Sequence, residues 1–447
     1  MQKKRIAFHT LGCKLNFSET STISRQFGKD NYELVDFGGQ ADVYVIHTCS
    51  VTAAAERKCK ASIRQAVKRN PNASVAVIGC AAQANPEIFL RMEGVSWVLG
   101  TQKKFRLGEI VNSMNSAGDK RYNDEYHGEF HDENKEADIS KTRKFIPSYS
   151  ANDRTRSFFK VQDGCDYFCT YCSIPLMRGR SRSDTIENTL KVAHEIAATG
   201  IKEIVLTGVN IGDFGRGNDE KFIQLIHELD KVTGIERIRI SSIEPELLSE
   251  EIIAFVAASK KILPHFHIPL QSGSDKILIA MQRKYLREVF AGRVNTIKKL
   301  MPGACIAADV IVGFPGETDE DFSDTYRFIN DLDISYLHVF TYSERPGTRA
   351  NAMAEAVDNK TRKRRSRELH NLSEEKKAHF YESQKGLFFN VLFESDQEDG
   401  MMFGFTENYI KVMTPFNAEL INRIITVRLL ERDGDCCGVV LKNIFCP

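Results

Sequence analysis

Three cysteines, Cys165, Cys169 and Cys172, lie within the short stretch CDYFCTYC. A closed zinc site uses four cysteine or histidine ligands, and no histidine lies between Cys165 and Cys172 or close to either end. Three thiolates can instead hold three irons of a 4Fe-4S cluster and leave the fourth iron open, as a catalytic site needs. The stretch therefore predicts an iron–sulfur centre whose missing ligand comes from a substrate or cofactor. A structural zinc site is the alternative.

Three further cysteines follow strand-like apolar runs. Cys13 comes after RIAFHT, Cys49 after VYVIHT and Cys80 after VAVIG. In a parallel sheet with right-handed crossovers these strand ends share one edge, which is where such sheets bind ligands. A single free cysteine is usually a small buried side chain, but three at equivalent strand ends predict a ligand set. The remaining cysteines are interpreted as core or incidental residues: Cys59, Cys305, Cys436, Cys437 and Cys446.

The elements that position these cysteines alternate between strand and helix for most of the 447 residues. This alternation predicts an α/β protein, with a parallel sheet followed by six strand–helix units, too few for a closed eight-unit barrel. Short strand-like runs at the C-terminus predict a small all-β, OB-like barrel. The predicted domains are a sheet domain at 1–118, an acidic linker at 119–150, a partial barrel at 151–357, a basic helical connector at 358–382 and the β barrel at 383–447.

Charge and composition limit the binding partners and the cellular compartments to be considered. The formal net charge is +1, so any polyanion must be bound by a local patch. No apolar run approaches the roughly 20 residues of a membrane span, and the N-terminus lacks the pattern of a signal peptide. We therefore expect a soluble, cytoplasmic protein without a membrane partner. Thiols stay reduced in the cytoplasm, so the 11 cysteines suggest ligands more than disulfides.

The spacing CxxxCxxC after the first strand of a partial barrel resembles the radical S-adenosylmethionine superfamily. That resemblance implies that the amino and carboxylate groups of the cofactor chelate the open iron, and that reductive cleavage gives a 5'-deoxyadenosyl radical. It also implies that Tyr171 packs near the adenine. Five residues at or after barrel strand ends are candidate cofactor contacts: Gly208, Asn210, Ser241, Glu244 and Gln271. From spacing alone, Gly208 is equally well explained as an ordinary strand-to-helix glycine.

Other motifs narrow the resemblance. LGCKLN, HTCSVT, VIGCAAQ, HFHIPLQSGSD, DVIVGFPGET and FTYSERPGTRA together resemble the methylthiotransferases over essentially the whole chain. The resemblance implies an auxiliary 4Fe-4S cluster on Cys13, Cys49 and Cys80, a radical barrel, and a C-terminal TRAM domain that binds RNA. LGCKLN resembles the signature of the tRNA N6-threonylcarbamoyladenosine branch, whereas the isopentenyladenosine branch tends to carry GCQMN and the ribosomal-protein branch LGCPKN.

The activity implied by this resemblance is insertion of a methylthio group at adenine C2 of position 37, next to the tRNA anticodon. It implies two 4Fe-4S clusters, S-adenosylmethionine, a tRNA substrate and an electron donor such as a flavodoxin or ferredoxin. The alternatives are the isopentenyladenosine or ribosomal-protein reaction and, from another class, a non-catalytic iron–sulfur electron carrier or RNA-binding module. The oligomeric state is not indicated by the sequence.

The sequence gives mixed signals for RNA contact. RKRRSR, at 362–367, either meets phosphates or forms a solvated helical face. Residues 386–447 hold nine acidic and five basic side chains, fewer cations than phosphate binding favours, while Phe403, Phe405 and Tyr409 serve either base stacking or the core. His9 and His47 are expected near the auxiliary cluster, and His265 and His267 are expected to serve packing.

Overall fold

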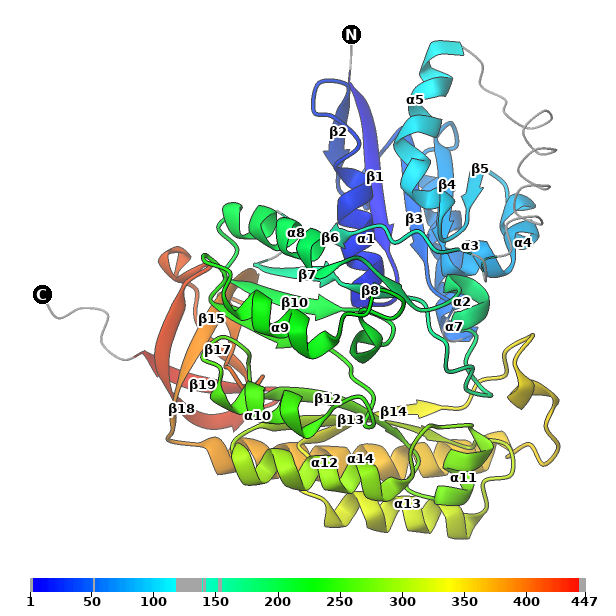
Figure 1. Ribbon diagram of the computed structural model, residues 1–447. Helices are drawn as coiled ribbons and strands as arrows, with labels where there is room; N and C mark the ends of the chain where they lie inside the picture. The colour runs from blue at the N-terminus through cyan, green and yellow to red at the C-terminus, as the bar shows by residue number, and fades with distance from the viewer. Residues whose placement is uncertain (1–2, 51–52, 118–138, 140–141, 152–154, 442–447) are drawn as a thin grey trace, which may run out of the picture. The chain divides into compact units, whose positions relative to one another are not determined.

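The computed structural model describes residues 3–50, 53–117, 139, 142–151 and 155–441 (Figure 1). The chain forms two compact units whose segments alternate between residues 150 and 183. The first unit comprises Met1–Ser150, Phe158–Asp166 and Ser173–Arg182, and the second comprises Ala151–Ser157, Tyr167–Cys172 and Ser183–Pro447. Of the predicted acidic linker, residues 119–138 and 140–141 lie outside the described residues, as does Cys446.

The first unit is built on a parallel five-stranded sheet of order β2-β1-β3-β4-β5, as the alternation of apolar runs and helical segments predicts. Val45 and Val77 point to opposite faces and both are fully buried, because helices cover the two faces. The strands and helices of this part are β1 Lys4–Thr10, α1 Lys14–Ser24, β2 Tyr32–Val35, β3 Val43–Thr48, α2 Ala53–Arg69, β4 Ser74–Gly79, α3 Cys80–Ala84, α4 Pro86–Leu90, β5 Val95–Leu99, η1 Lys103–Arg106 and α5 Leu107–Ala117.

Short elements follow where the chain alternates between the units. They are β6 Ser148–Tyr149, β7 Arg156–Lys160, β8 Gln162–Asp163, α7 Ile174–Arg178 and β9 Arg182–Ser183. β6 pairs with β7 in the antiparallel direction. Gly164, just before Cys165, has φ +73°, and a Cβ there would lie 2.0 Å from the Arg180 carbonyl oxygen, so only glycine fits this close approach.

The second unit contains the strand–helix repeats of the predicted partial barrel. β10 pairs with β11, and β12, β13 and β14 form a second parallel group. Its strands and helices are α8 Ile186–Ala198, β10 Glu203–Thr207, η3 Ile211–Asp213, α9 Phe222–Asp230, β11 Arg237–Ile240, α10 Glu250–Ala258, β12 His265–Gln271, α11 Asp275–Ala280, α12 Arg287–Leu300, β13 Cys305–Val312, α13 Asp319–Asp331, β14 Tyr336–Thr341, η4 Arg349–Ala352 and α14 Asn359–Gln384.

Local sequence explains where several of these helices begin. The Thr185 and Ser249 hydroxyls accept hydrogen bonds from backbone N–H groups of the first turns of α8 and α10. Thr318 and Asp321 form a reciprocal capping box at the start of α13. Asp358 caps α14 by accepting from the N–H groups of Lys360 and Thr361. Each cap satisfies donors that the helix itself leaves without partners.

The C-terminal strands close into a barrel of order β15-β16-β17-β19-β18, which confirms the predicted all-β module. Its elements are β15 Phe388–Glu398, β16 Met401–Phe405, β17 Lys411–Pro415, η5 Ala418–Leu420, β18 Ile424–Asp433 and β19 Cys436–Leu441. Its core continues into β13 and α14, since Cys305, Phe380 and Tyr381 pack in the same cluster as Val391 and Val427.

Two arginines of β11 also join this module to the rest of the second unit. Arg237 donates to the carbonyl oxygens of Phe405 and Thr406 at 3.2 and 3.0 Å, and Arg239 donates to that of Glu407 at 3.1 Å. Phe405 stacks on Tyr409 with ring centroids 4.8 Å apart. Both rings lie beneath arginines, which favours the core interpretation of these aromatics.

The basic stretch at 362–367 lies in α14 and divides into two kinds of residue. Arg362 and Arg365 are buried and form ion pairs with Glu344 and Glu317, at 2.8 and 2.6 Å. Lys363, Arg364 and Arg367 are exposed. The two buried arginines therefore serve the fold, and an RNA phosphate can reach only the exposed members.

The structure also bears on two predictions, which concern membrane-spanning helices and the cysteines outside the two ligand groups. Within the described residues, no helix combines the length and apolar character required to cross a membrane. Each cysteine in the described part of the chain is a free thiol, and Cys59, Cys305, Cys436 and Cys437 are buried as predicted.

Candidate active site

The first group of cysteines lies at one edge of the five-stranded sheet. β1, β3 and β4 are neighbours and run parallel, and Cys49 and Cys80 directly follow β3 and β4. Cys13 follows β1 after a short turn and precedes the first residue of α1. The turn depends on Gly12, which has φ +104°. A Cβ at Gly12 would lie 2.8 Å from the Cys49 Cβ, so glycine lets the segment that carries Cys13 approach Cys49.

Charge interactions bring Cys80 into the same neighbourhood. Desolvation by the surrounding protein raises the pKa of Cys13, the charge of Arg178 opposes the rise, and a Cys80 thiolate adds to it. Thiolates at Cys80 and Cys13 in turn help to hold the pKa of Arg178 well above its ordinary value. Cys13 is exposed, whereas Cys49 and Cys80 are buried. Cys13 and Cys80 therefore both lie within electrostatic reach of the Arg178 guanidinium, and the close approach at Gly12 places Cys49 beside the segment that carries Cys13.

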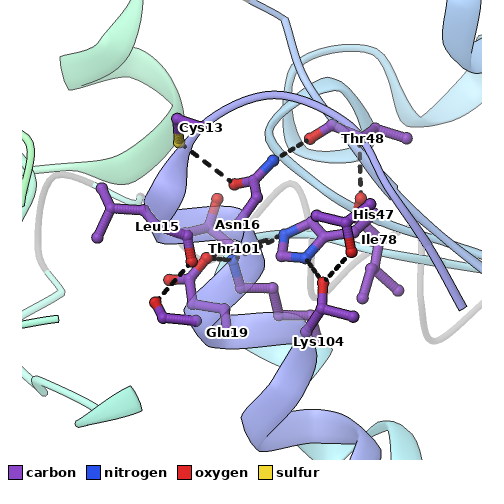
Figure 2. A network of polar contacts seen from close by, with 12 residues as sticks. Cys13, Leu15, Asn16, Glu19, His47, Thr48, Ile78, Thr101 and Lys104 are labelled. Carbon is purple, nitrogen blue, oxygen red and sulfur yellow. Dashed lines mark hydrogen bonds and ion pairs between the residues drawn. The ribbon is translucent and has the colours of Figure 1, made fainter. Parts of the chain in front are cut away.

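Behind Cys13 lies a buried ionic network centred on Glu19 of α1 (Figure 2). The Glu19 carboxylate accepts from Lys104 at 2.5 Å and from Lys160 at 3.0 Å, and both oxygens accept from Arg178 at 3.1 Å. Arg178 also donates to Asp163 at 2.9 Å. Ion pairs removed from water in this way need close geometry and several hydrogen bonds, and this network supplies both.

This network contains more cations than carboxylates. Arg182 also pairs with Asp163, at 2.8 Å, so four basic side chains share two acidic ones: Lys104, Lys160, Arg178, Arg182, Glu19 and Asp163. The cations hold the pKa of both carboxyls well below the ordinary range even though burial opposes this. An excess of buried positive charge beside three cysteines fits an anionic group there, such as thiolates that hold an iron–sulfur cluster.

Two polar residues connect the network to the cysteines. Asn16 donates to the carbonyl oxygens of Leu11 and Thr48, at 2.7 and 3.1 Å, and its Oδ1 accepts from Arg178 at 2.9 Å. The same Oδ1 lies 3.9 Å from the Cys13 Sγ. His47 is fully buried against Thr20 and Lys104, and burial lowers its pKa well below 6.5, so it is neutral. His9 instead stacks on Phe37.

The second group of cysteines lies in one loop, which passes from the first unit to the second between Asp166 and Tyr167. In the first unit, the Cys165 N–H donates to the Gly179 carbonyl oxygen at 3.1 Å. In the second unit, the Thr170 N–H donates to the Met281 carbonyl oxygen and the Thr170 carbonyl oxygen accepts from Ala350. These bonds fix the ends of the loop to separate parts of the fold.

Arg283 lies at the centre of the second unit's part of this site. It donates to the Cys169 Sγ at 3.1 Å and to the Tyr171 hydroxyl at 3.4 Å, and it forms an ion pair with Glu244. Burial raises the pKa of Glu244 to about 7 even though Arg283 opposes the rise. Thus the structure joins three predicted residues, Cys169, Tyr171 and Glu244, through an arginine.

The remaining predicted cofactor contacts lie at or near barrel strand ends. Asn210 is buried and lies near the hydroxyl of Tyr167, which belongs to the cysteine loop. Gly208 follows β10, Ser241 follows β11, and Gln271 ends β12 with a left-handed φ of +66°. Their roles stay predictions, as does cluster binding by the six cysteines.

Apart from Glu244, sequence reasoning missed the charged residues of both sites. One signal was available for Glu19, which shares a helix face with the apolar Leu15 and Ile23 at spacings of four residues. A carboxylate on such a face requires buried cations. Arg283 carries no comparable pattern, because it lies in the turn after α11 and meets Cys169 only through the tertiary fold.

Comparison with known proteins places this geometry among characterised folds. The model of the Radical SAM superfamily matches residues 159–329, and the model described as Uncharacterized protein family UPF0004 matches residues 5–100. The solved structure of the radical S-adenosylmethionine methyltransferase TsrM from Kitasatospora setae is similar, with a TM-score of 0.56 and 14% identity. The match covers 78% of this chain and 75% of the TsrM chain. At that identity the likeness shows the fold alone.

Two curated relatives match nearly the whole chain. Threonylcarbamoyladenosine tRNA methylthiotransferase MtaB of Bacillus subtilis is 40% identical over 436 residues, which is 95% of this chain and 94% of the relative. The tRNA-2-methylthio-N(6)-dimethylallyladenosine synthase of Syntrophus aciditrophicus is 30% identical over 452 residues, which is 100% of this chain and 93% of the relative.

Proposed function

Because this chain belongs to the radical SAM methylthiotransferases, we propose that it inserts a methylthio group at C2 of N6-threonylcarbamoyladenosine at position 37 of tRNA. The substrate assignment is supported by relatives named for threonylcarbamoyladenosine that are 40% and 38% identical, against 30% for a relative named for dimethylallyladenosine. The observation that carries the reaction type is the presence of two separate cysteine groups in one chain.

The residues of both groups fit 4Fe-4S clusters. Cys13, Cys49 and Cys80 would hold one cluster and the three cysteines of the loop would hold the other, each leaving one iron open. When bound, the clusters and S-adenosylmethionine would relay an electron and supply the methyl group and the radical that removes hydrogen from adenine C2. We also propose a cytoplasmic setting and an electron donor such as a flavodoxin or ferredoxin.

The protein's own residues set the charge around these groups. Arg283 donates to the Cys169 sulfur and holds Glu244 beside it, which restrains the loop and stabilises a thiolate at Cys169. At the other site burial raises the pKa of Cys13, and the charge of the buried Arg178 opposes that rise. Exposed Lys363 and Arg367 of α14 are candidates for phosphate contact.

The test is to purify the protein without oxygen, reconstitute the clusters, and supply S-adenosylmethionine, a strong reductant and tRNA. Two tRNA substrates are compared, one carrying threonylcarbamoyladenosine and one carrying isopentenyladenosine, and the digested nucleosides are measured by mass spectrometry. We expect a methylthio mass gain on the threonylcarbamoyl nucleoside only. If neither nucleoside changes while 5'-deoxyadenosine accumulates, the radical chemistry holds and the tRNA assignment is wrong.

A second candidate is the isopentenyladenosine reaction, favoured by the dimethylallyladenosine synthase relative that matches the full length of this chain. Mass gain on the isopentenyl nucleoside alone would select it. The ribosomal-protein reaction becomes the next candidate if both nucleosides stay unchanged.

A further inference from the structure

Three side chains with metal-binding atoms share one face of the β12-β13-β14 sheet. Asp309 and His338 are directly paired in the register of β13 and β14. His267 pairs with Ala307, two residues before Asp309, so its side chain lies on the same face as that of Asp309. The other face of β13 carries the buried Val310 and neighbours packed beneath helices, which include α12 and α14 (Figure 1). The trio therefore lies on the face away from those helices.

The atoms of the trio converge. The His267 Nε2 lies 2.6 Å from the Asp309 Oδ1, and the rings of His267 and His338 meet edge to face with centroids 5.0 Å apart. One nitrogen or oxygen from each residue lies within 4.8 Å of the other two. Both His265 and His267 were expected to serve packing: His265 is tilted against Tyr409 at 4.4 Å, whereas His267 adds a hydrogen bond to Asp309 to its contact with the His338 ring.

This set of donor atoms is typical of sites for divalent transition-metal ions. Two imidazoles and one carboxylate bind divalent transition metals and leave positions open for water or another oxygen ligand. Ligand bonds to such ions are about 2.0–2.2 Å long, which places neighbouring ligand atoms roughly 3 Å apart, so the trio needs only small movements. The surroundings are acidic as well, because the charge of Asp309 contributes to the raised pKa of Glu244.

We propose that His267, Asp309 and His338 form a binding site for one divalent transition-metal ion. The site uses none of the cysteines and does not depend on the identity of the tRNA substrate. Since imidazole ligands favour Fe²⁺ and Zn²⁺ over Mn²⁺, the natural occupant belongs to the later, tighter-binding ions of the series.

The test uses Mn²⁺, because this ion prefers oxygen and nitrogen ligands and avoids the thiolates that hold the clusters. The cluster-loaded enzyme is titrated without oxygen, and free Mn²⁺ is measured by its room-temperature electron paramagnetic resonance signal. We expect one bound Mn²⁺ per chain, released on addition of one equivalent of Zn²⁺. Asp309→Asn, which keeps the shape of the side chain, should weaken binding by roughly tenfold or more.

His227→Gln is the matched control, because His227 stacks on Phe255 away from the trio, and we expect it to bind Mn²⁺ like wild type. Iron content and the urea unfolding midpoint show whether each variant is folded. His338→Gln, at an exposed position, gives a second test if Asp309→Asn does not fold. Equal affinity in wild type and a folded trio variant, or the absence of Mn²⁺ binding in wild type, would overturn the proposal and leave His267 and Asp309 as a hydrogen-bonded pair.

Discussion

The two cysteine groups reach a similar donor set by opposite routes. In the first unit the cysteines come from three strand ends and meet only because β1, β3 and β4 are neighbours in the sheet. They are backed by four buried cations that share two carboxylates. The second group lies in a single loop that runs from the first unit into the second, and one arginine of the second unit contacts Cys169 beside a carboxyl whose pKa is about 7. The first site is therefore fixed by the fold and its buried charge, and the second by local spacing.

The largest effect is expected from removing either cysteine group, because each group is predicted to carry a different part of the chemistry. Replacing Cys165, Cys169 and Cys172 together by alanine should remove about four iron atoms per chain and abolish 5'-deoxyadenosine formation. Replacing Cys13, Cys49 and Cys80 together by alanine should also remove about four iron atoms per chain. In that variant 5'-deoxyadenosine should still form, but methylthio transfer should be lost. Iron analysis and nucleoside mass spectrometry measure these outcomes. Loss of 5'-deoxyadenosine in both variants would mean that the groups do not act separately.

The buried network should make the first site the more sensitive to loss of charge. Glu19→Gln leaves Lys104, Lys160 and Arg178 with too little compensating charge, so we expect the free energy of unfolding to fall by about 3–5 kcal/mol. Urea unfolding under anaerobic conditions measures this fall. The control is Lys191→Ala, which breaks a solvent-exposed pair with Glu187 and should leave the free energy of unfolding nearly unchanged. A similarly small change for Glu19→Gln would show that the network contributes little.

The second site should make stability depend on pH. The pKa of Glu244 is about 7 in the folded protein against 4.5 in the unfolded chain, so the folded state binds the extra proton between these values. Stability should therefore fall as pH rises toward 7, by about 2 kcal/mol between pH 5.5 and 8, and level off above that range. Urea unfolding across this range should show a flatter profile for Glu244→Gln. An unchanged slope in that variant would assign the dependence to other groups.

The smallest effect concerns a cysteine near the first group. Cys59 is buried in α2, and its Sγ lies 3.7 Å from the Cys49 carbonyl oxygen. Cys59→Ala should leave the iron content unchanged and lower the free energy of unfolding by about 1 kcal/mol, because only a small buried group is lost. Loss of iron in this variant would add Cys59 to the ligand set.

The sequence was most informative where structure is local or periodic. The longer strands, such as β1, β3, β4 and β13, follow apolar runs that can be read directly, whereas the two-residue strands β8 and β9 do not; the six cysteines stand out by their spacing and by their places at strand ends. The Glu19 network could not be predicted with its partners, because Lys104 and Arg178 lie far away in sequence. The same limit applies to Arg283 and to the pairing of His267 with Asp309 across strands.

The RKRRSR stretch shows a different limit. A run of like charges is typical of a solvated face, yet Arg362 and Arg365 are buried because Glu344 and Glu317 lie within reach of α14. Helical spacing predicts that residues three apart share a face, and here that face is turned toward the protein. Only the tertiary partners decide which members of such a run remain available to RNA.

The connection between the C-terminal barrel and β11 has a consequence for protein engineering. Removing residues 383–447 would strip carbonyl partners from Arg237 and Arg239 and uncover the cluster that contains Cys305 and Tyr381. The module therefore cannot be cut off or transplanted as an independent tail. A workable graft between relatives would have to carry α14 and a matching β11 surface together with the five C-terminal strands.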